Sequence, residues 1–217
     1  MAQYGDFAWR TSRLYLSPLT TIATRARAYG LERIPATGSC VLAINHLHWI
    51  DVAIVGALSP RNINYVAKGE VQRVPLVGRF LLWHGVIPVR RGESDRDAVR
   101  AMRAYAASGR VIGLFVEGTR QRTGRPGKAQ PGAAMVAIQE SVPVLPVAVY
   151  GTQSWRIGNF APCSLAVGQP VRFEDMPKGG RGYREATAEI EHRINVLFDW
   201  LADVQAQGRP RDLAPPV

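Results

Sequence analysis

Short apolar runs alternate with helical patterns from residue 31 onward. The runs expected to form strands are 40–45, 63–67, 85–89, 111–117 and 143–150, with 163–168 as a possible later addition. The helical patterns cover 51–59, 74–84, 94–108, 132–141 and 184–205. Strands that are apolar on both faces and separated by helices favour a mainly parallel sheet, because the crossover helices bury both of its faces. The pattern therefore predicts the α/β class, in a single-domain sandwich whose central sheet is covered by helices.

The first thirty residues follow a different pattern. Ser17 and Pro18 are typical of a helix start, with an N-cap residue before a proline at the first helical position, and Gly30 is typical of a helix end. The spacing of apolar residues between them predicts an amphipathic helix over about 18–29. Before this helix, aromatic, aliphatic and basic residues are interleaved, which suits a bilayer interface and equally a segment that covers the sheet.

These patterns divide the chain into three parts. We expect residues 1–29 to be an amphipathic, membrane-associating helical segment, 30–207 to be the main domain, and 208–217 to be a flexible tail. No run reaches the ~18 apolar residues that a membrane span needs, and the first residues lack the apolar core of a secretory signal. We therefore expect the protein to stay in the cytosol.

Charge and cysteine content narrow the class of protein only slightly. The formal net charge of +10 indicates an anionic partner. Nucleic acid, a phospholipid surface, an acidic protein and a phosphorylated substrate all fit this charge. Cys40 and Cys163 are far apart and form no C-x-x-C pair, which favours two reduced thiols over a disulfide or a zinc site.

His46 and Asp51, in the stretch NHLHWID (45–51), are the first candidates for chemistry. On one continuous helix, side chains five residues apart would point in different directions. Here a strand is expected to end at Asn45 and a helix to begin near Asp51, so the carboxylate can hydrogen-bond one nitrogen of His46 and leave the other as a general base. The simpler interpretation is that Asp51 only caps the helix and His46 only ends the strand.

A metal site is a third interpretation of the same stretch. His46 and His48 form an H-x-H pair that projects to one side of an extended strand, and Asp51 would be a third ligand. The other histidines, His84 and His192, lie in no recognisable ligand pair, and the chain has no H-E-x-x-H motif. We therefore expect no metal, with a metallohydrolase as the competing hypothesis.

Charged residues also follow two other predicted strands. Arg91 follows 85–89, and Glu117 to Arg120 follow the apolar part of 111–117. Ligands of such sheets collect outside the carboxyl ends of the strands, so we expect these residues to face one cleft. Arginine binds phosphate through a planar fork, Gly118 and Thr119 allow a ligand to approach closely, and Glu117 can orient an arginine or accept a hydrogen bond from a substrate hydroxyl.

Four stretches, NHLHWID, GVIPVRR, FVEGTR and VPVLPVAV, occur in an order and at intervals that resemble the four sequence blocks of the glycerolipid acyltransferase family. That family is typified by bacterial 1-acylglycerol-3-phosphate acyltransferases, and the resemblance covers roughly residues 30–175. His46 and Asp51 match the family's histidine and aspartate, which four residues separate. Arg91 matches the end of the second block, and Lys68 resembles the lysine that often precedes it.

The resemblance implies transfer of an acyl group from acyl carrier protein or coenzyme A to the free hydroxyl of 1-acyl-sn-glycerol 3-phosphate, with no cofactor or metal. By analogy, His46 deprotonates the hydroxyl and Asp51 holds and charges the imidazole. The residues expected to bind the phosphorylated acceptor are Lys68, Arg91, Glu117, Gly118, Thr119 and Arg120. The positive charge then fits an anionic membrane, so we expect a peripheral protein on the inner face of the cell membrane that does not bind nucleic acid.

Two departures from the family pattern leave alternatives open. The family usually has serine where this chain has His48, and proline where it has Val116. A different lysolipid or a glycolipid is therefore an alternative acceptor. A non-enzymatic, basic module that binds lipid or nucleic acid is the alternative from another class, although the chain has no recognisable base-reading motif.

Overall fold

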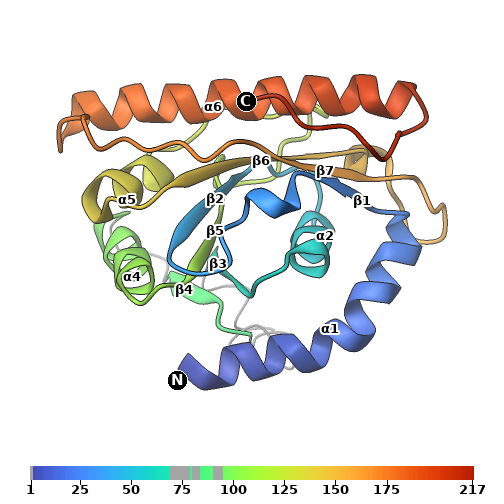
Figure 1. Cartoon of the computed structure of the whole chain (residues 1–217), viewed down its shortest axis with the longest axis horizontal. Coiled ribbons are helices and arrows are strands. Elements are labelled where there is room, and N and C mark those ends of the chain that lie inside the picture. The colour runs from blue at the N-terminus through green and yellow to red at the C-terminus, as the bar shows by residue number, and fades with distance from the viewer. Residues whose placement is uncertain (1, 69–78, 80–83, 90–94) are drawn as a thin grey trace.

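A computed structural model describes residues 2–68, 79, 84–89 and 95–217. Its centre is a seven-stranded sheet in the order β1-β7-β6-β2-β5-β3-β4 (Figure 1). The strands are β1 (Arg27–Tyr29), β2 (Cys40–Ile44), β3 (Ile63–Lys68), β4 (Ile87–Val89), β5 (Val111–Phe115), β6 (Val144–Tyr150) and β7 (Ser164–Val167). Five strands run in one direction, whereas β7 and β1 run in the other, because β7 pairs antiparallel with β6. The predicted α/β class with a mainly parallel sheet is confirmed.

Helices cover both faces of this sheet (Figure 1). They are α1 (Ala2–Thr24), α2 (Asp51–Leu58), α4 (Asp95–Ala107), α5 (Gly132–Glu140) and α6 (Gly180–Ala206). Alternate side chains of β2 point to opposite faces. Leu42 packs in a buried cluster with Val55 of α2, whereas Val41 packs in a second cluster with residues of α4, α5 and α6. This two-sided burial is why β2 reads as a continuous apolar run.

The prediction for the N-terminal segment is wrong in both its start and its end. Instead of beginning at Pro18, the helix begins at Ala2, passes through Pro18 and ends at Thr24, and Figure 1 shows it bent. Contacts with the body of the protein favour the longer helix: Arg13 Nη1 donates to Ser59 O at 3.0 Å, and Ser12 Oγ lies 2.8 Å from His84 Nε2. The end of the predicted helix forms β1 instead, which pairs with β7.

The C-terminal part divides into a helix and an extended segment. The long helix is close to its predicted range and buries the expected stripe of Ile190, Ile194, Leu197 and Leu201. The expected flexible tail instead makes contacts with the body, since Gln169 N donates to Val217 O at 2.6 Å and Arg33 Nη2 donates to Pro215 O at 2.7 Å. Most of the helix predicted over 74–84 lies outside the described residues.

Two further expectations concern cysteines and membrane spans. Cys40 and Cys163 are both buried and unpaired, as expected for reduced thiols. Among the residues that the structure describes, none of the helices is long and apolar enough to cross a membrane.

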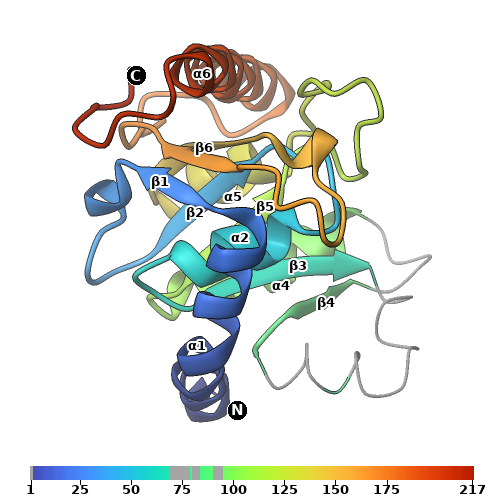
Figure 2. The same cartoon turned by 90° about the vertical axis from the view of Figure 1, so that its right-hand side faces the viewer.

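The carboxyl ends of the five parallel strands meet at one edge, called here the carboxyl edge; the opposite edge is the amino edge. Figure 2 shows the loops after β5 and β6 on the side toward which the arrowhead of β3 points. These two loops touch, since a Cβ at Gly124 would lie 3.9 Å from Gln153 Cγ. Because β7 and β1 run in the opposite direction, the end of α1 also lies at this edge, where Ala23 O accepts a hydrogen bond of 2.9 Å from Trp155 Nε1.

Candidate active site

His46 and Asp51 meet at the carboxyl edge, just beyond β2. His46 Nδ1 lies 2.9 Å from Asp51 Oδ2, and the same oxygen accepts hydrogen bonds of 2.7 Å from the backbone N–H groups of Leu47 and His48. Asp51 is the first residue of α2 and is fully buried. A turn between strand and helix therefore brings together two side chains that a continuous helix would separate, as the sequence predicted. With a proton on Nδ1 bonded to the carboxylate, His46 Nε2 is left as the basic nitrogen.

Side chains around His46 hold its position. Asn45 is fully buried and extends the pairing of β2 with β6, because its amide donates to Val149 O at 3.1 Å and accepts from Val149 N at 2.7 Å. The His46 ring stacks on Phe115, with centroids 4.1 Å apart, and Phe115 stacks on Tyr65. Gly113 makes room for this stack, since a Cβ there would come within 2.8 Å of the Tyr65 ring.

Glu117 follows β5 beside this pair and is 5 % exposed. Its Oε1 accepts a hydrogen bond of 3.3 Å from Gly127 N. Burial raises the pKa of Glu117 to about 7, backbone N–H groups including that of His46 oppose the rise, and the charge of Asp51 adds to it. The carboxyl group therefore titrates near neutral pH, in a position to exchange hydrogen bonds with a ligand hydroxyl.

The loop after Glu117 brings the remaining residues of the FVEGTR stretch to the surface. Gly118 has a φ of 67° and open space around its Cα, and Thr119 and Arg120 are exposed. Gln121 N donates to His46 O at 2.8 Å, which fixes this loop against the strand that carries the imidazole. The predicted cluster at this edge therefore includes Glu117 to Arg120.

The other two predicted phosphate ligands are Lys68 and Arg91. Lys68 is the last residue of β3, whose backbone pairs with Val89 at the end of β4, so its backbone lies at the carboxyl edge. Arg91 lies outside the described residues.

Two residues that the sequence did not single out for this site also lie here: Trp155 and Arg156, in the loop after β6. The Trp155 ring is 4 % exposed and lies 5.7 Å from the His48 ring and 5.6 Å from the Trp49 ring, between centroids. Arg156 Nη1 donates to Gln153 O and Trp155 O at 3.1 and 2.7 Å. No sequence signal links residues 155 and 156 to residue 48, because packing alone brings the loops together.

Unpaired buried polar atoms gather at the carboxyl edge. Five buried side-chain nitrogen or oxygen atoms of the described residues have no hydrogen-bond partner, and three of them follow β2, β5 and β6: Asp51 Oδ1, Glu117 Oε2 and Thr152 Oγ1. Thr152 begins a short 3-10 helix, η3 (Thr152–Ser154). Buried polar groups normally have partners, so this concentration indicates a place where a ligand or water completes the hydrogen bonds.

The side-chain atoms that would bind a metal in the alternative site form hydrogen bonds within the protein instead. Asp51 Oδ2 already accepts three hydrogen bonds, and His48 Nδ1 accepts one of 3.4 Å from Ile50 N. Among the described ranges, no three His, Cys, Asp or Glu side chains are arranged to hold a metal ion. This geometry gives the metallohydrolase hypothesis no support from side-chain placement.

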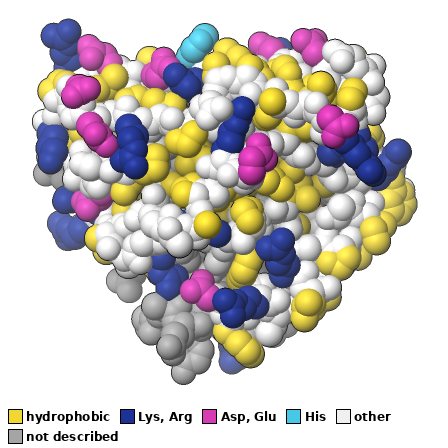
Figure 3. Space-filling model, viewed as in Figure 1, with side chains coloured by type: hydrophobic (Ala, Val, Ile, Leu, Met, Phe, Trp, Pro, Cys, Tyr) yellow, Lys and Arg dark blue, Asp and Glu magenta, His cyan; other side chains and the backbone are white. Residues whose placement is uncertain are grey.

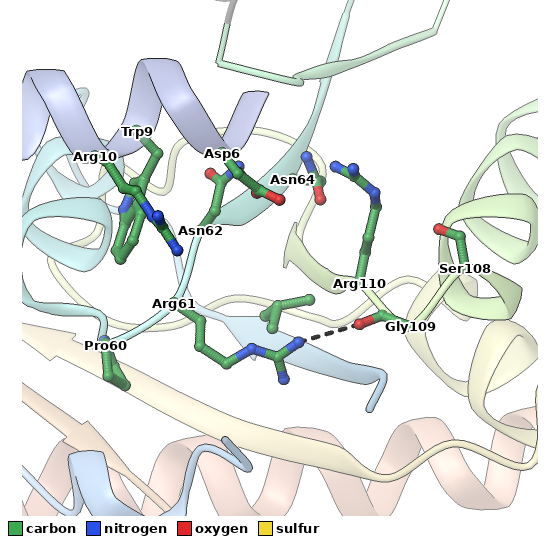
Figure 4. Close-up of a pocket in the computed structure, with 11 residues that line it drawn as sticks. Asp6, Trp9, Arg10, Pro60, Arg61, Asn62, Asn64, Ser108, Gly109 and Arg110 are labelled. Atoms are coloured by element: carbon green, nitrogen blue, oxygen red, sulfur yellow. Dashed lines mark hydrogen bonds between the residues drawn. The ribbon is translucent and has the colours of Figure 1, made fainter. Parts of the chain in front are cut away.

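A cavity of about 360 Å³ lies at the amino edge, far along the strands from His46 (Figure 4). It is lined by Arg10, Arg61, Arg110 and polar residues of α1 and of the loops before β3 and β5. Arg61 donates to Pro35 O and Gly38 O at 2.8 Å and to Gly109 O at 3.1 Å. Asn62 and Asn64 are also hydrogen-bonded to neighbours, whereas Trp9 Nε1 is buried without a partner. The carboxyl edge has three such unpaired atoms and the His46–Asp51 pair, so we take that edge as the candidate active site.

Comparisons with known proteins identify the family of this chain. A family model described as "Acyltransferase" matches residues 25–150, which is more than half of the chain and includes His46, Asp51 and Glu117 to Arg120. A 1-acyl-sn-glycerol-3-phosphate acyltransferase of Bacillus subtilis is 27 % identical over 84 % of this chain and 96 % of its own length. A protein of the same name from Pseudomonas aeruginosa is 24 % identical over 94 % of this chain and 87 % of its own length.

One solved structure has a similar fold. The crystal structure of the 1-acyl-sn-glycerophosphate acyltransferase PlsC from Thermotoga maritima superposes with a TM-score of 0.67 at 22 % identity, covering 91 % of this chain and 83 % of the other. This likeness shows that the two proteins share a fold.

Proposed function

The chain belongs to the glycerolipid acyltransferase family, and from that premise we propose that it transfers a fatty acyl group from a thioester to the free hydroxyl of 1-acyl-sn-glycerol 3-phosphate. The product would be phosphatidate, a precursor of phospholipids. The observation that carries the proposal is the hydrogen bond between His46 Nδ1 and Asp51 Oδ2 at the carboxyl edge. Relatives with this activity in their names support the choice of acceptor.

His46 acts as general base in this proposal. Asp51 fixes the imidazole with its proton on Nδ1, and Nε2 takes the proton of the acceptor hydroxyl as its oxygen attacks the thioester carbonyl carbon. The C–S bond then breaks, and the imidazolium returns the proton to the leaving thiolate. Asp51 stabilises the transient imidazolium because its carboxylate is buried against it. General-base assistance of this kind contributes about 10²–10⁴ in rate, and positioning contributes much of the remainder.

The acceptor is held by the residues around the base. Arg120, Lys68 and Arg91 bind its phosphate, while Gly118 and Thr119 allow its glycerol to approach the backbone. Glu117 contacts a glycerol hydroxyl through its unpaired Oε2. A pKa near 7 lets this carboxyl group donate or accept in that contact.

The co-substrate is an acyl thioester, and no cofactor or metal takes part. Acyl carrier protein and coenzyme A are both acidic, and the net charge of +10 favours either.

We place the protein at the inner face of the cell membrane, in the cytoplasm, because the acceptor is a lipid and because α1 presents apolar side chains to solvent. Leu14 is 81 % exposed, and the other large exposed apolar residues of α1 are Phe7, Tyr15, Leu19 and Ile22. Figure 3 shows apolar side chains along the margin where α1 lies, with lysine or arginine side chains nearby. An apolar helix surface flanked by arginines suits an anionic bilayer, where each basic residue contributes about 1 kcal/mol.

Product analysis tests the proposed function. The purified protein is incubated with a panel of acyl thioesters, on coenzyme A and on acyl carrier protein, and a panel of lysolipids including lysophosphatidate. Mass spectrometry should find phosphatidate as the main product. Acylation of a different lysolipid or of a glycolipid in its place would move the activity to the alternative acceptor, and no acylated product from any pair would refute the proposal.

A flotation assay tests the location separately. The protein should float with vesicles that contain anionic phospholipid, and Leu14→Ser combined with Ile22→Ser should reduce the floating fraction. Equal flotation of both proteins would show that α1 does not dock on the bilayer.

A further inference from the structure

His48, which stands where the family usually has serine, has a defined orientation beside the base. Its backbone N–H donates to Asp51 Oδ2, and its Nδ1 accepts a long hydrogen bond of 3.4 Å from Ile50 N. The ring lies against Trp49 and Trp155, with centroids 5.5 and 5.7 Å away. An Nδ1 that accepts a hydrogen bond assigns the proton of the neutral ring to Nε2, so His48 presents an N–H donor.

Two arginines from different loops lie near enough to this imidazole for their charges to lower the pKa of His48. Arg120 precedes Gln121, whose N–H donates to His46 O, and Arg156 follows Trp155, whose ring touches His48. Arg156 Nη1 donates to two backbone carbonyls, and its Nε and Nη2, which have no hydrogen-bond partner among the described residues, are left for a ligand. Within the part of the chain that the structure describes, neither arginine forms an ion pair with a carboxylate.

We propose that His48 and Arg156 join Arg120 in binding the phosphate monoester of the acceptor, with His48 donating from Nε2 and the two arginines donating from their guanidinium groups. This inference rests on the proposed function and adds two residues, His48 and Arg156, that the family resemblance does not supply. It assigns the loop between β6 and β7 to recognition of the acceptor.

The chemistry of the three side chains selects a phosphate. Two guanidinium forks and one neutral imidazole N–H offer donors only, and a phosphate monoester dianion supplies charge and acceptor oxygens for all of them. The position selects the phosphate of the acceptor. Its free hydroxyl must reach His46 Nε2, and that hydroxyl and the phosphate are borne by adjacent carbons of the glycerol, so the phosphate has to bind close to the base.

The pKa of the His48 imidazole is a quantity that this proposal predicts to change when phosphate binds. Burial lowers the pKa of His48, the charges of Arg156, Arg120 and His46 lower it further, and the charge of Asp51 opposes them. The ring is therefore neutral at pH 7. A phosphate dianion bound between the arginines would offset their charge, so it should raise the pKa of His48.

The first experiment is an NMR titration of the histidine rings in the ¹⁵N-labelled full chain, with sn-glycerol 3-phosphate as the probe. The chain has four histidines, and the His48 resonances are assigned with His48→Ser. Saturating probe should raise the pKa of His48 by about one pH unit, and the exposed His192 on α6 serves as the internal control. A pKa of His48 that is the same with and without the probe would overturn the proposal.

The second experiment measures affinity in matched variants. Arg156→Gln should weaken binding of sn-glycerol 3-phosphate about tenfold or more, since a charged hydrogen bond is lost. Arg172→Gln removes the same charge near the amino edge, where Val171 pairs with Val144, and should bind like the wild type. His48→Ala should weaken binding more than His48→Ser, whose hydroxyl can still donate. Equal affinity of Arg156→Gln and wild type would overturn the proposal.

Two further comparisons distinguish phosphate binding by these residues from binding to a lipid surface and from the acylation activity. If Arg156→Gln reduces flotation with anionic vesicles but leaves the affinity for sn-glycerol 3-phosphate unchanged, the arginine serves the bilayer and the inference fails. If the wild type shows the expected response of His48 but does not acylate lysophosphatidate, the phosphate site stands and the proposed function fails. If it acylates lysophosphatidate while His48 does not respond, the proposed function stands and the inference fails.

Discussion

Arg61, before β3, and Arg120, after β5, lie at opposite edges of the sheet and differ in their hydrogen-bond partners. At the amino edge, Arg61 donates to three backbone carbonyls that precede β2 and β5, and so ties the starts of the central strands together. At the carboxyl edge, Arg120 is exposed and has no carboxylate partner among the described residues. One arginine completes the fold, and the other remains available to a ligand.

The polar residues of the two edges differ in the same way. Near the amino edge, Asn64 donates to Gly85 O at 2.8 Å and Asn62 donates to Asp6 Oδ1 at 3.0 Å. At the carboxyl edge, Asp51 Oδ1 and Glu117 Oε2 are buried without partners. Unsatisfied polar groups are costly, so they persist where function requires them. The cavity in Figure 4 holds one such atom, Trp9 Nε1, whereas the carboxyl edge holds three, so the cavity is weaker evidence for a site than that cluster.

Replacement of Asp51 should produce the largest effect and should act on turnover. Asp51 Oδ2 accepts hydrogen bonds from His46, Leu47 and His48. Asp51→Asn replaces this charged carboxylate by a neutral amide. We expect kcat for lysophosphatidate acylation to fall by about 10²–10⁴, because the imidazole loses its orientation and its counter-charge. Steady-state kinetics of protein shown to be folded by circular dichroism check this, and an unchanged kcat would contradict it.

Replacement of Arg61 should affect stability and leave the chemistry intact. Arg61→Gln removes three hydrogen bonds to backbone carbonyls and should lower the free energy of unfolding by about 2–4 kcal/mol. Urea denaturation measures the loss. The folded variant should keep its kcat/KM, and a large loss of kcat/KM without loss of stability would remove the distinction between the two edges.

Glu117 makes stability depend on pH. Its folded pKa of about 7 lies above its ordinary value of 4.5, so between these values the folded protein holds a proton that the unfolded chain has released. Stability from this group is therefore present at low pH, is lost as the pH rises through that window, and stays constant above it. The free energy of unfolding of the wild type, relative to Glu117→Gln, should fall by about 3 kcal/mol between pH 4.5 and 8. Parallel pH profiles of the two proteins would show that Glu117 does not titrate near 7.

Tyr65 should show the smallest effect, because its ring and its hydroxyl have separate roles. Tyr65→Phe removes a hydrogen bond of 3.1 Å to Val52 O but keeps the ring that stacks on Phe115. We expect a loss of about 1 kcal/mol in stability and little change in kcat. Thermal denaturation and the acylation assay check the two parts, and a drop in kcat comparable to that of Asp51→Asn would mean that the hydroxyl acts in the site.

Much of the fold was predictable because burial leaves a pattern in the sequence. The two-sided burial of β2, β5 and β6 makes each an apolar run, and the stripe of α6 recurs at helical spacing. The start of α1 was not predictable, because Ser17 and Pro18 have the local form of a helix start while contacts with residues far along the chain extend the helix through them. The edge strand β1 was also missed, since Arg27–Tyr29 is short and is ordered by pairing with β7.

The candidate site was predictable where its residues are close in sequence. A strand end, a turn and a helix start bring His46 to Asp51, and the FVEGTR stretch follows its own strand. The contribution of Trp155 and Arg156 was not predictable, because their loop reaches His48 only through the order of β6 and β2 in the sheet. The burial that raises the pKa of Glu117 is likewise a tertiary effect that the stretch alone does not encode.

The central claim is that His46 at the carboxyl edge is the base for acyl transfer to lysophosphatidate. The most direct measurement compares phosphatidate formation by the wild type, His46→Ala and His192→Ala, where His192 is an exposed histidine of α6 that serves as the matched control. The account predicts that His46→Ala loses about 10²–10⁴ in kcat while it stays folded and that His192→Ala retains wild-type turnover. Full turnover by His46→Ala would contradict the claim.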